Sequence, residues 1–166
     1  MDTFEPHKLQ ALCEKRIYFG HQSVGYNIIE GLGDLKKTVK GLSGLRIADL
    51  KTNATMDGPG FYHSPIGLNR KPQSKINAFR EIMISTLPSD SIDLAFFKLC
   101  YVDITQTTDV KTLFSSYRRN IEELSQRLNR TTFAHVTTPL TVRPSGKKAA
   151  IMNFLLGDSA YLVRCR

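Results

Sequence analysis

One serine of this sequence stands in a setting that suits nucleophilic chemistry. Ser23 follows the apolar run 17–19 and lies between Gly20 and Gly25, just before apolar residues begin to recur at helical spacing. A sharp turn from a strand into a helix can present a hydroxyl to a ligand, and the start of the helix stabilises negative charge that develops there. Serine is also a preferred N-cap residue. The position predicts either a nucleophile or a helix cap, and position alone favours the cap.

Three histidines could supply the base that a nucleophilic serine needs. His21 is two residues from Ser23, His135 lies inside a run that is predicted as a strand, and His63 lies in a long loop. A base must come within about 2.6–3.2 Å of the hydroxyl that it activates, so the sequence leaves the choice open. A histidine inside a strand is more often a hydrogen-bonded core residue.

Four further positions could bind or orient a substrate. Gly67 would let the backbone approach a ligand closely, and the Asn69 amide could donate to an oxyanion, although both residue types also serve ordinary turns. Tyr101 and Asp103 stand at the end of a nearly continuous apolar run. Asp103 could orient a histidine or bind substrate.

The elements that must position these residues alternate between strand and helix. Apolar patterning predicts strands over 16–20, 45–50, 92–102 and 131–136, and helices over 24–35, 72–87, 110–128 and 149–156. Thr107 or Thr108 could cap the helix over 110–128. Residues 51–71 show no periodicity and predict a long functional loop. The run 92–102 predicts the central strand, covered on both faces. Right-handed crossovers then give a mainly parallel, three-layer α/β domain with strand order 2-1-3-4, whose ligands bind where the order reverses, between strands one and three.

Composition narrows the class of protein further. The 166 residues predict a single domain, and neither a membrane-length apolar run nor a secretory leader is evident, which predicts a cytoplasmic protein. Three widely spaced cysteines indicate neither disulfides nor a zinc site. The net charge of +8 is scattered, which favours a solvated surface over a nucleic-acid site. The sequence has neither a phosphate-binding glycine motif nor HExxH or a comparable metal-ligand spacing, so we expect no nucleotide, metal or other cofactor.

The order of these segments resembles that of the SGNH/GDSL hydrolase superfamily, whose sheet is flavodoxin-like. Residues 17–23 look like its first block, with Ser23 as the nucleophile, and Gly67 matches the oxyanion-hole glycine of its second block, with Asn69 close by. Cys100-Tyr101-Val102-Asp103 corresponds to the third block, where Val102 replaces the usual asparagine. The last block, Asp-x-x-His, has no counterpart, because the nearest string, 158–161, lacks the histidine. The resemblance therefore implies a domain over 1–166 that is shortened at its C-terminal end.

We therefore predict a serine-dependent ester hydrolase, of esterase or deacetylase type, that acts on a small acyl ester. The predicted catalytic residues are Ser23, His21, Asp103 and His135, and the predicted oxyanion and substrate residues are Gly67, Asn69, His63 and Tyr101. Two alternatives stay open: a catalytically incomplete relative that binds a ligand without turnover, and a basic module that contacts phosphate through its Lys/Arg-rich tail. An exposed edge at strand 131–136 would also allow a homo-oligomer to form.

Overall fold

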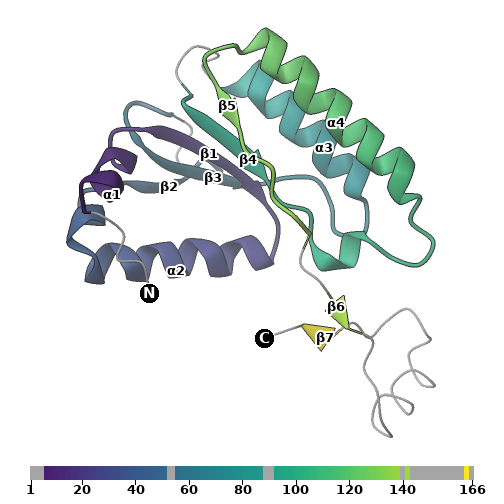
Figure 1. Ribbon diagram of the computed structural model, residues 1–166, viewed down its shortest axis with the longest axis horizontal. Coiled ribbons are helices and arrows are strands. Elements are labelled where there is room, and N and C mark those ends of the chain that lie inside the picture. Colours follow the sequence, from purple (N-terminus) through teal and green to yellow (C-terminus); the bar gives the residue numbers. More distant parts are fainter. Residues whose placement is uncertain (1–5, 52–54, 88–91, 139–140, 143–162, 165–166) are drawn as a thin grey trace, which may run out of the picture.

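The computed structural model describes residues 6–51, 55–87, 92–138, 141–142 and 163–164 as an α/β fold. Its five-stranded sheet is entirely parallel, and the strands run in the order β2-β3-β1-β4-β5 (Figure 1). The elements are α1 (Pro6–Leu12), β1 (Arg16–His21), α2 (Val24–Thr38), η1 (Lys40–Leu42), β2 (Ile47–Asp49), β3 (Gly60–Pro65), α3 (Pro72–Glu81), η2 (Ile82–Thr86), β4 (Leu94–Phe97), η3 (Tyr101–Asp103), α4 (Val110–Arg127) and β5 (Thr132–Phe133). Two further strands, β6 (Thr141–Val142) and β7 (Val163–Arg164), pair antiparallel.

The structure confirms a parallel α/β sheet but not the strand order predicted from the sequence. Strand β3 lies between β2 and β1, in the segment 51–71 that was predicted as a loop. That loop prediction was wrong because glycine and proline flank β3 closely, which hid a short strand that is paired on both sides. The central strand is β1, which has two strands on each side, so the prediction that the run 92–102 forms the central strand was wrong. The run 92–102 contributes only the four residues of β4 before the chain turns into η3.

Strand β1 divides the core into two layers, because successive side chains point to opposite faces of the sheet. Tyr18 packs with Phe79 beneath α3 and α4, whereas Phe19 packs with Phe61 and Phe96 on the side of α2. Figure 1 shows α2 on one side of the sheet and α3 with α4 on the other. Since both faces are covered, five of the six β1 residues are buried.

The predicted helix starts are confirmed at one helix and shifted at another. Pro72 occupies the first turn of α3, which continues as η2 and ends before Pro88, as the sequence predicts. Neither Thr107 nor Thr108 caps α4. Asp109 does so, because its carboxylate accepts a hydrogen bond from the Thr112 amide at 3.1 Å. The predicted helix 149–156 lies outside the described residues.

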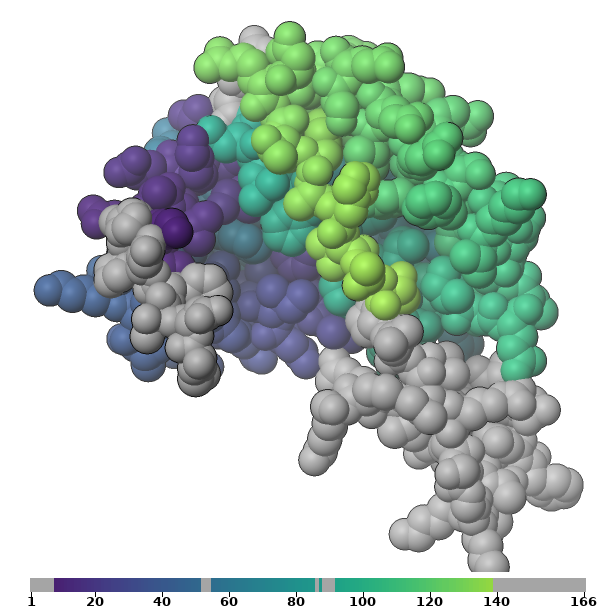
Figure 2. Space-filling model, in the orientation of Figure 1, coloured from purple at the N-terminus to yellow at the C-terminus, as the bar shows by residue number. Residues whose placement is uncertain are grey.

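Strand β5 forms the edge of the sheet opposite β2, and an open groove lies beside it. The groove has a volume of about 970 Å³ and runs between α4 and the segment 135–138. Figure 2 shows the segment after β5 lying along the surface next to α4. Phe114 and Val110 on this side of α4 are largely exposed. Association of two copies through this edge stays a prediction.

Candidate functional site

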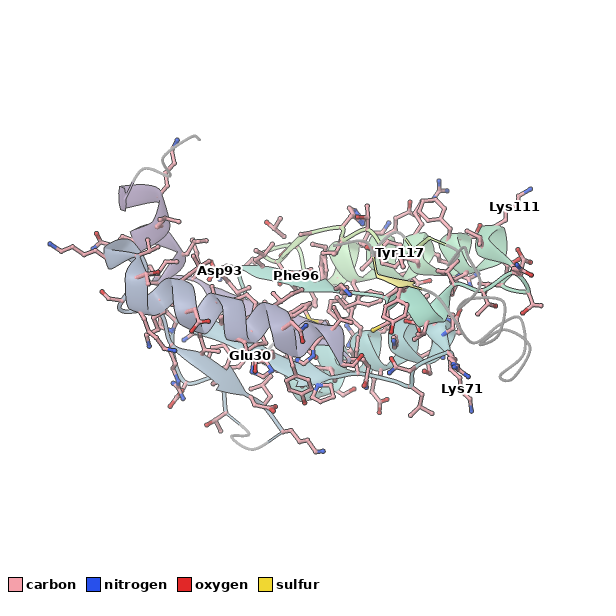
Figure 3. All side chains as sticks on the ribbon, turned by 90° about the horizontal axis from the view of Figure 1, so that it is seen from below. Glu30, Lys71, Asp93, Phe96, Lys111 and Tyr117 are labelled. Carbon is pink, nitrogen blue, oxygen red and sulfur yellow. The ribbon has the colours of Figure 1, made fainter. Side chains whose placement is uncertain are left out.

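The segments that follow β1, β3 and β4 meet at the carboxyl edge of the sheet. The Gln22 side chain donates to the carbonyl oxygens of Ile66 and Gly67, at 3.1 and 2.8 Å. The Ser23 hydroxyl lies 3.9 Å from the Cys100 sulfur. In Figure 3, Lys71, which precedes α3, and Lys111, in the first turn of α4, lie at the end of the molecule opposite Asp93, which precedes β4. The structure thus brings together the segments that carry Ser23, Gly67 and Cys100.

Ser23 occupies the N-cap position of α2, but its hydroxyl does not cap the helix. The residue is exposed, and its side chain makes no hydrogen bond to the amides of the first turn. The start of a 15-residue helix carries partial positive charge and amides without partners inside the helix. The prediction that the Ser23 side chain caps the helix is therefore wrong, and the hydroxyl is available for other chemistry.

His21 is buried under α2 and does not contact the serine hydroxyl through a hydrogen bond. Its Nε2 lies 3.0 Å from Nδ1 of His63, and its ring stacks on Phe19. Gly25 packs over the ring so closely that a Cβ there would lie 2.3 Å from the His21 Cβ. Within the described residues, no imidazole is hydrogen-bonded to Ser23 Oγ, so a base for Ser23 is not assembled in this structure.

His63 lies in β3, where it is buried, and not in a loop as the sequence suggested. Its neighbour across the sheet is Asp49 of β2. Burial lowers the pKa of both histidines, and for His21 the pKa falls to about 4, with a smaller contribution from the charge of His63. Asp49 opposes these shifts only in part. The pair is therefore held neutral near pH 7, with one ring nitrogen donating to the other.

Because of this histidine pair, we expect the free energy of unfolding to decrease in mild acid. The pKa of His21 is lowered in the folded state, so the unfolded chain binds the proton more tightly. The free energy of unfolding should be at its plateau above about pH 6.5 and should fall by about 2–3 kcal/mol as the pH drops towards 4. Urea unfolding between pH 7 and 4.5 measures this slope.

A matched pair of variants separates His21 from other groups that titrate in the same range. His21→Gln keeps a side chain that can donate to His63 but binds no proton, so the acid slope should become shallower. His135→Gln, which changes an exposed histidine outside this pair, is the matched control. Equal slopes in wild type and His21→Gln would contradict the assignment.

Asp103 forms a buried ion pair with a lysine, and it does not orient a histidine. Its Oδ2 lies 2.5 Å from Lys75 Nζ, and both side chains are fully buried. The same oxygen accepts from the Cys100 amide at 2.6 Å, and Oδ1 accepts from the Arg70 amide at 2.9 Å. The predicted role of Asp103 as the partner of a catalytic histidine finds no support in these contacts.

Lys75 was not among the residues that the sequence singled out, and it links two of the candidate segments. Besides Asp103, its ammonium donates to Asn69 Oδ1 at 3.0 Å. The only signal in the sequence is its spacing of four residues from Phe79, which places it on the buried face of α3. A lysine on such a face is an informative exception, because lysine is almost never fully buried without a partner.

Gly67 and Asn69 lie next to this lysine. Gly67 has φ of +53°, and a Cβ there would lie 2.6 Å from the Lys75 amide nitrogen, so only glycine fits. An ammonium group can only donate, so the Asn69 oxygen faces Lys75 and the Asn69 NH₂ is left for another acceptor. This orientation suits the oxyanion role that the sequence predicts for Asn69.

Tyr101 and His135, the last two predicted site residues, lie in different parts of the structure. Tyr101 opens η3 directly after Cys100 and is half-buried. His135 follows β5, is exposed, and bonds through Nδ1 to the Tyr117 hydroxyl at 2.8 Å, where it lines the groove beside α4. It was predicted inside a strand, but β5 ends at Phe133. The structure groups His135 with α4 and not with Ser23.

Comparison of the chain with protein-family models, with curated proteins and with solved structures found no match. Within the described residues, no cluster of three or more histidine, cysteine, aspartate or glutamate side chains is arranged to hold a metal ion. None of the described helices has both the length and the hydropathy needed to cross a membrane. The function and the cytoplasmic location therefore stay predictions.

Proposed function

We propose that the protein is a serine-dependent ester hydrolase of esterase or deacetylase type, with Ser23 as its nucleophile. The observation that carries this proposal is that Ser23 is an exposed residue at the start of α2 whose hydroxyl does not cap the helix. Gly67 and Asn69 come from the neighbouring segment, which Gln22 ties to the first block. The resemblance to the SGNH/GDSL superfamily supports the same assignment of Ser23 and Gly67.

The reaction proceeds through an acyl-serine. Ser23 Oγ attacks the carbonyl carbon of the ester while the hydroxyl proton passes to solvent water. The bond to the alcohol oxygen then breaks, and the alcohol leaves as an anion. Water then adds to the acyl carbon, Ser23 regains a proton, and a carboxylic acid is released. The Ser23 and Gly67 amides with the Asn69 NH₂ hold the developing oxyanion, which the start of α2 also stabilises.

The surroundings of Ser23 indicate which esters react fastest. The hydroxyl's neighbour is the Cys100 sulfur, 3.9 Å away, and a thiol is a weak donor and acceptor. Because no imidazole among the described residues is hydrogen-bonded at Ser23 to protonate the alcohol, the leaving group must be able to depart as an anion. Short acyl esters of acidic alcohols, such as aryl acetates, should therefore react fastest. Turnover is slow, because a site without a triad accelerates the reaction only about 10³–10⁴-fold over the rate in water.

A fluorophosphonate probe tests this proposal directly. The purified protein is treated with the probe while hydrolysis of an aryl acetate is followed, and the adduct is located by mass spectrometry of the peptides. We expect one adduct, on Ser23, and hydrolysis that declines in step with labelling. Heat-unfolded protein serves as the control and should not be labelled. An unlabelled, inactive native protein, or an adduct on another residue, would contradict the proposal.

A second function is favoured by one specific observation. Asp103, the residue that would orient a histidine, is neutralised by Lys75, and the described imidazoles of His21, His63 and His135 bond elsewhere. We propose as the alternative a protein that binds an acyl ester or its carboxylic acid at Ser23 without turnover. In this case the probe leaves the protein unlabelled, while acetate or an aryl acetate still shifts the amide resonances of Ser23 and Gly67.

A further inference from the structure

The Lys75 ammonium lies at the centre of the contacts that join the segments after β3 and β4. It reaches Asn69 in the first segment and Asp103 in the second, at 3.0 and 2.5 Å. The Asp103 carboxylate in turn accepts hydrogen bonds from the backbone amides of Arg70 and Cys100. One continuous series of polar contacts therefore runs from Asn69 to Cys100, whose sulfur is the neighbour of Ser23 Oγ.

The fold alone does not require an ion pair at this place. Burying two charges costs about as much as their attraction returns, and well-packed apolar residues of the same size often stabilise a protein equally well. What an apolar pair cannot do is fix the direction of a carboxamide. Lys75 offers only donors, so it holds the Asn69 oxygen and turns the Asn69 NH₂ away from itself.

We propose that Lys75 is a positioning residue for acyl transfer at Ser23. It acts through Asn69, whose NH₂ it presents to the oxyanion, and through Asp103, which keeps η3 and Cys100 against Ser23. This inference rests on the proposed function, because it assigns the oxyanion donor that replaces the absent third-block asparagine. Lys75 itself is fully buried and touches no substrate.

A double-mutant cycle between Lys75 and Asn69 tests the proposal. The measured quantity is the rate constant for fluorophosphonate labelling of Ser23, divided by the folded fraction of each variant. We expect Asn69→Ala and Lys75→Met each to lower this rate at least about tenfold, since each removes the same oriented donor. Ser23 in the double variant should be labelled no more slowly than in the slower single variant, because both substitutions remove the same contribution, that of the oriented donor.

Leu124→Ala provides the matched control for lost stability. Leu124 is buried in α4 and has no part in the polar contacts of Lys75, and its truncation weakens the fold through a cavity. Its labelling rate per folded molecule should equal that of wild type. If Lys75→Met also labels like wild type once the folded fraction is counted, or if the two losses multiply, the positioning role is overturned while the hydrolase proposal stands. If wild type is not labelled, both are overturned.

Discussion

Replacing Ser23 with alanine is expected to lower kcat/KM for an aryl acetate at least about tenfold, because the acyl-serine route loses its attacking oxygen while the oxyanion and binding contributions remain. The same change should alter the free energy of unfolding by no more than about 0.5 kcal/mol, as is usual for a surface position. Loss of a working serine cap would cost about 0.5–2 kcal/mol instead. Initial-rate kinetics and urea unfolding of the same preparation measure both quantities.

Ser43→Ala is the control for this prediction. Ser43 lies beyond the opposite end of α2, and its hydroxyl donates to the Lys40 carbonyl at 2.9 Å. Its kcat/KM should match that of wild type. A Ser23→Ala protein that keeps wild-type activity would show that the hydrolysis comes from elsewhere. A loss of stability near 2 kcal/mol, with activity unchanged, would restore the capping role.

The sequence predicted the class of the fold and much of its layout, since helices and buried strands leave periodic signals. It missed β3 because Gly60 opens this strand and Pro65 closes it. Both residue types are typical of loops, and the pairing with β1 and β2 that overrides this local preference is not visible in a single sequence. The missed strand explains why His63 was placed in a loop.

The segments of the candidate site could be predicted, but the directions of their side chains could not. The sequence placed Ser23 and Asp103 at strand ends that share one edge of the sheet, and it placed Gly67 in a loop just ahead of a helix. The structure brings these segments together. His21 shares its face of β1 with Phe19. Because β1 is buried on both faces, its apolar run did not reveal that this face lies under α2.

Lys75→Met is expected to lower the free energy of unfolding by about 3–5 kcal/mol. Methionine fills most of the space of the lysine chain but leaves the Asp103 carboxylate buried without its counterion, and breaking a buried pair from one side is costly. The Cys100 and Arg70 amides still donate to Asp103, which favours the lower part of that range. Urea unfolding with a constant m-value measures the loss.

An exposed ion pair on the same helix shows how much of this loss comes from burial. Arg80 of α3 lies 3.2 Å from Glu123, and both side chains are close to half exposed. Arg80→Met should therefore cost less than about 1 kcal/mol. Lys75→Met/Asp103→Leu should recover most of the loss of the single variant, because no charge is then left buried. A Lys75→Met protein as stable as Arg80→Met would mean that water reaches Asp103, and the dry ion pair on which the orientation of Asn69 depends would not exist in solution.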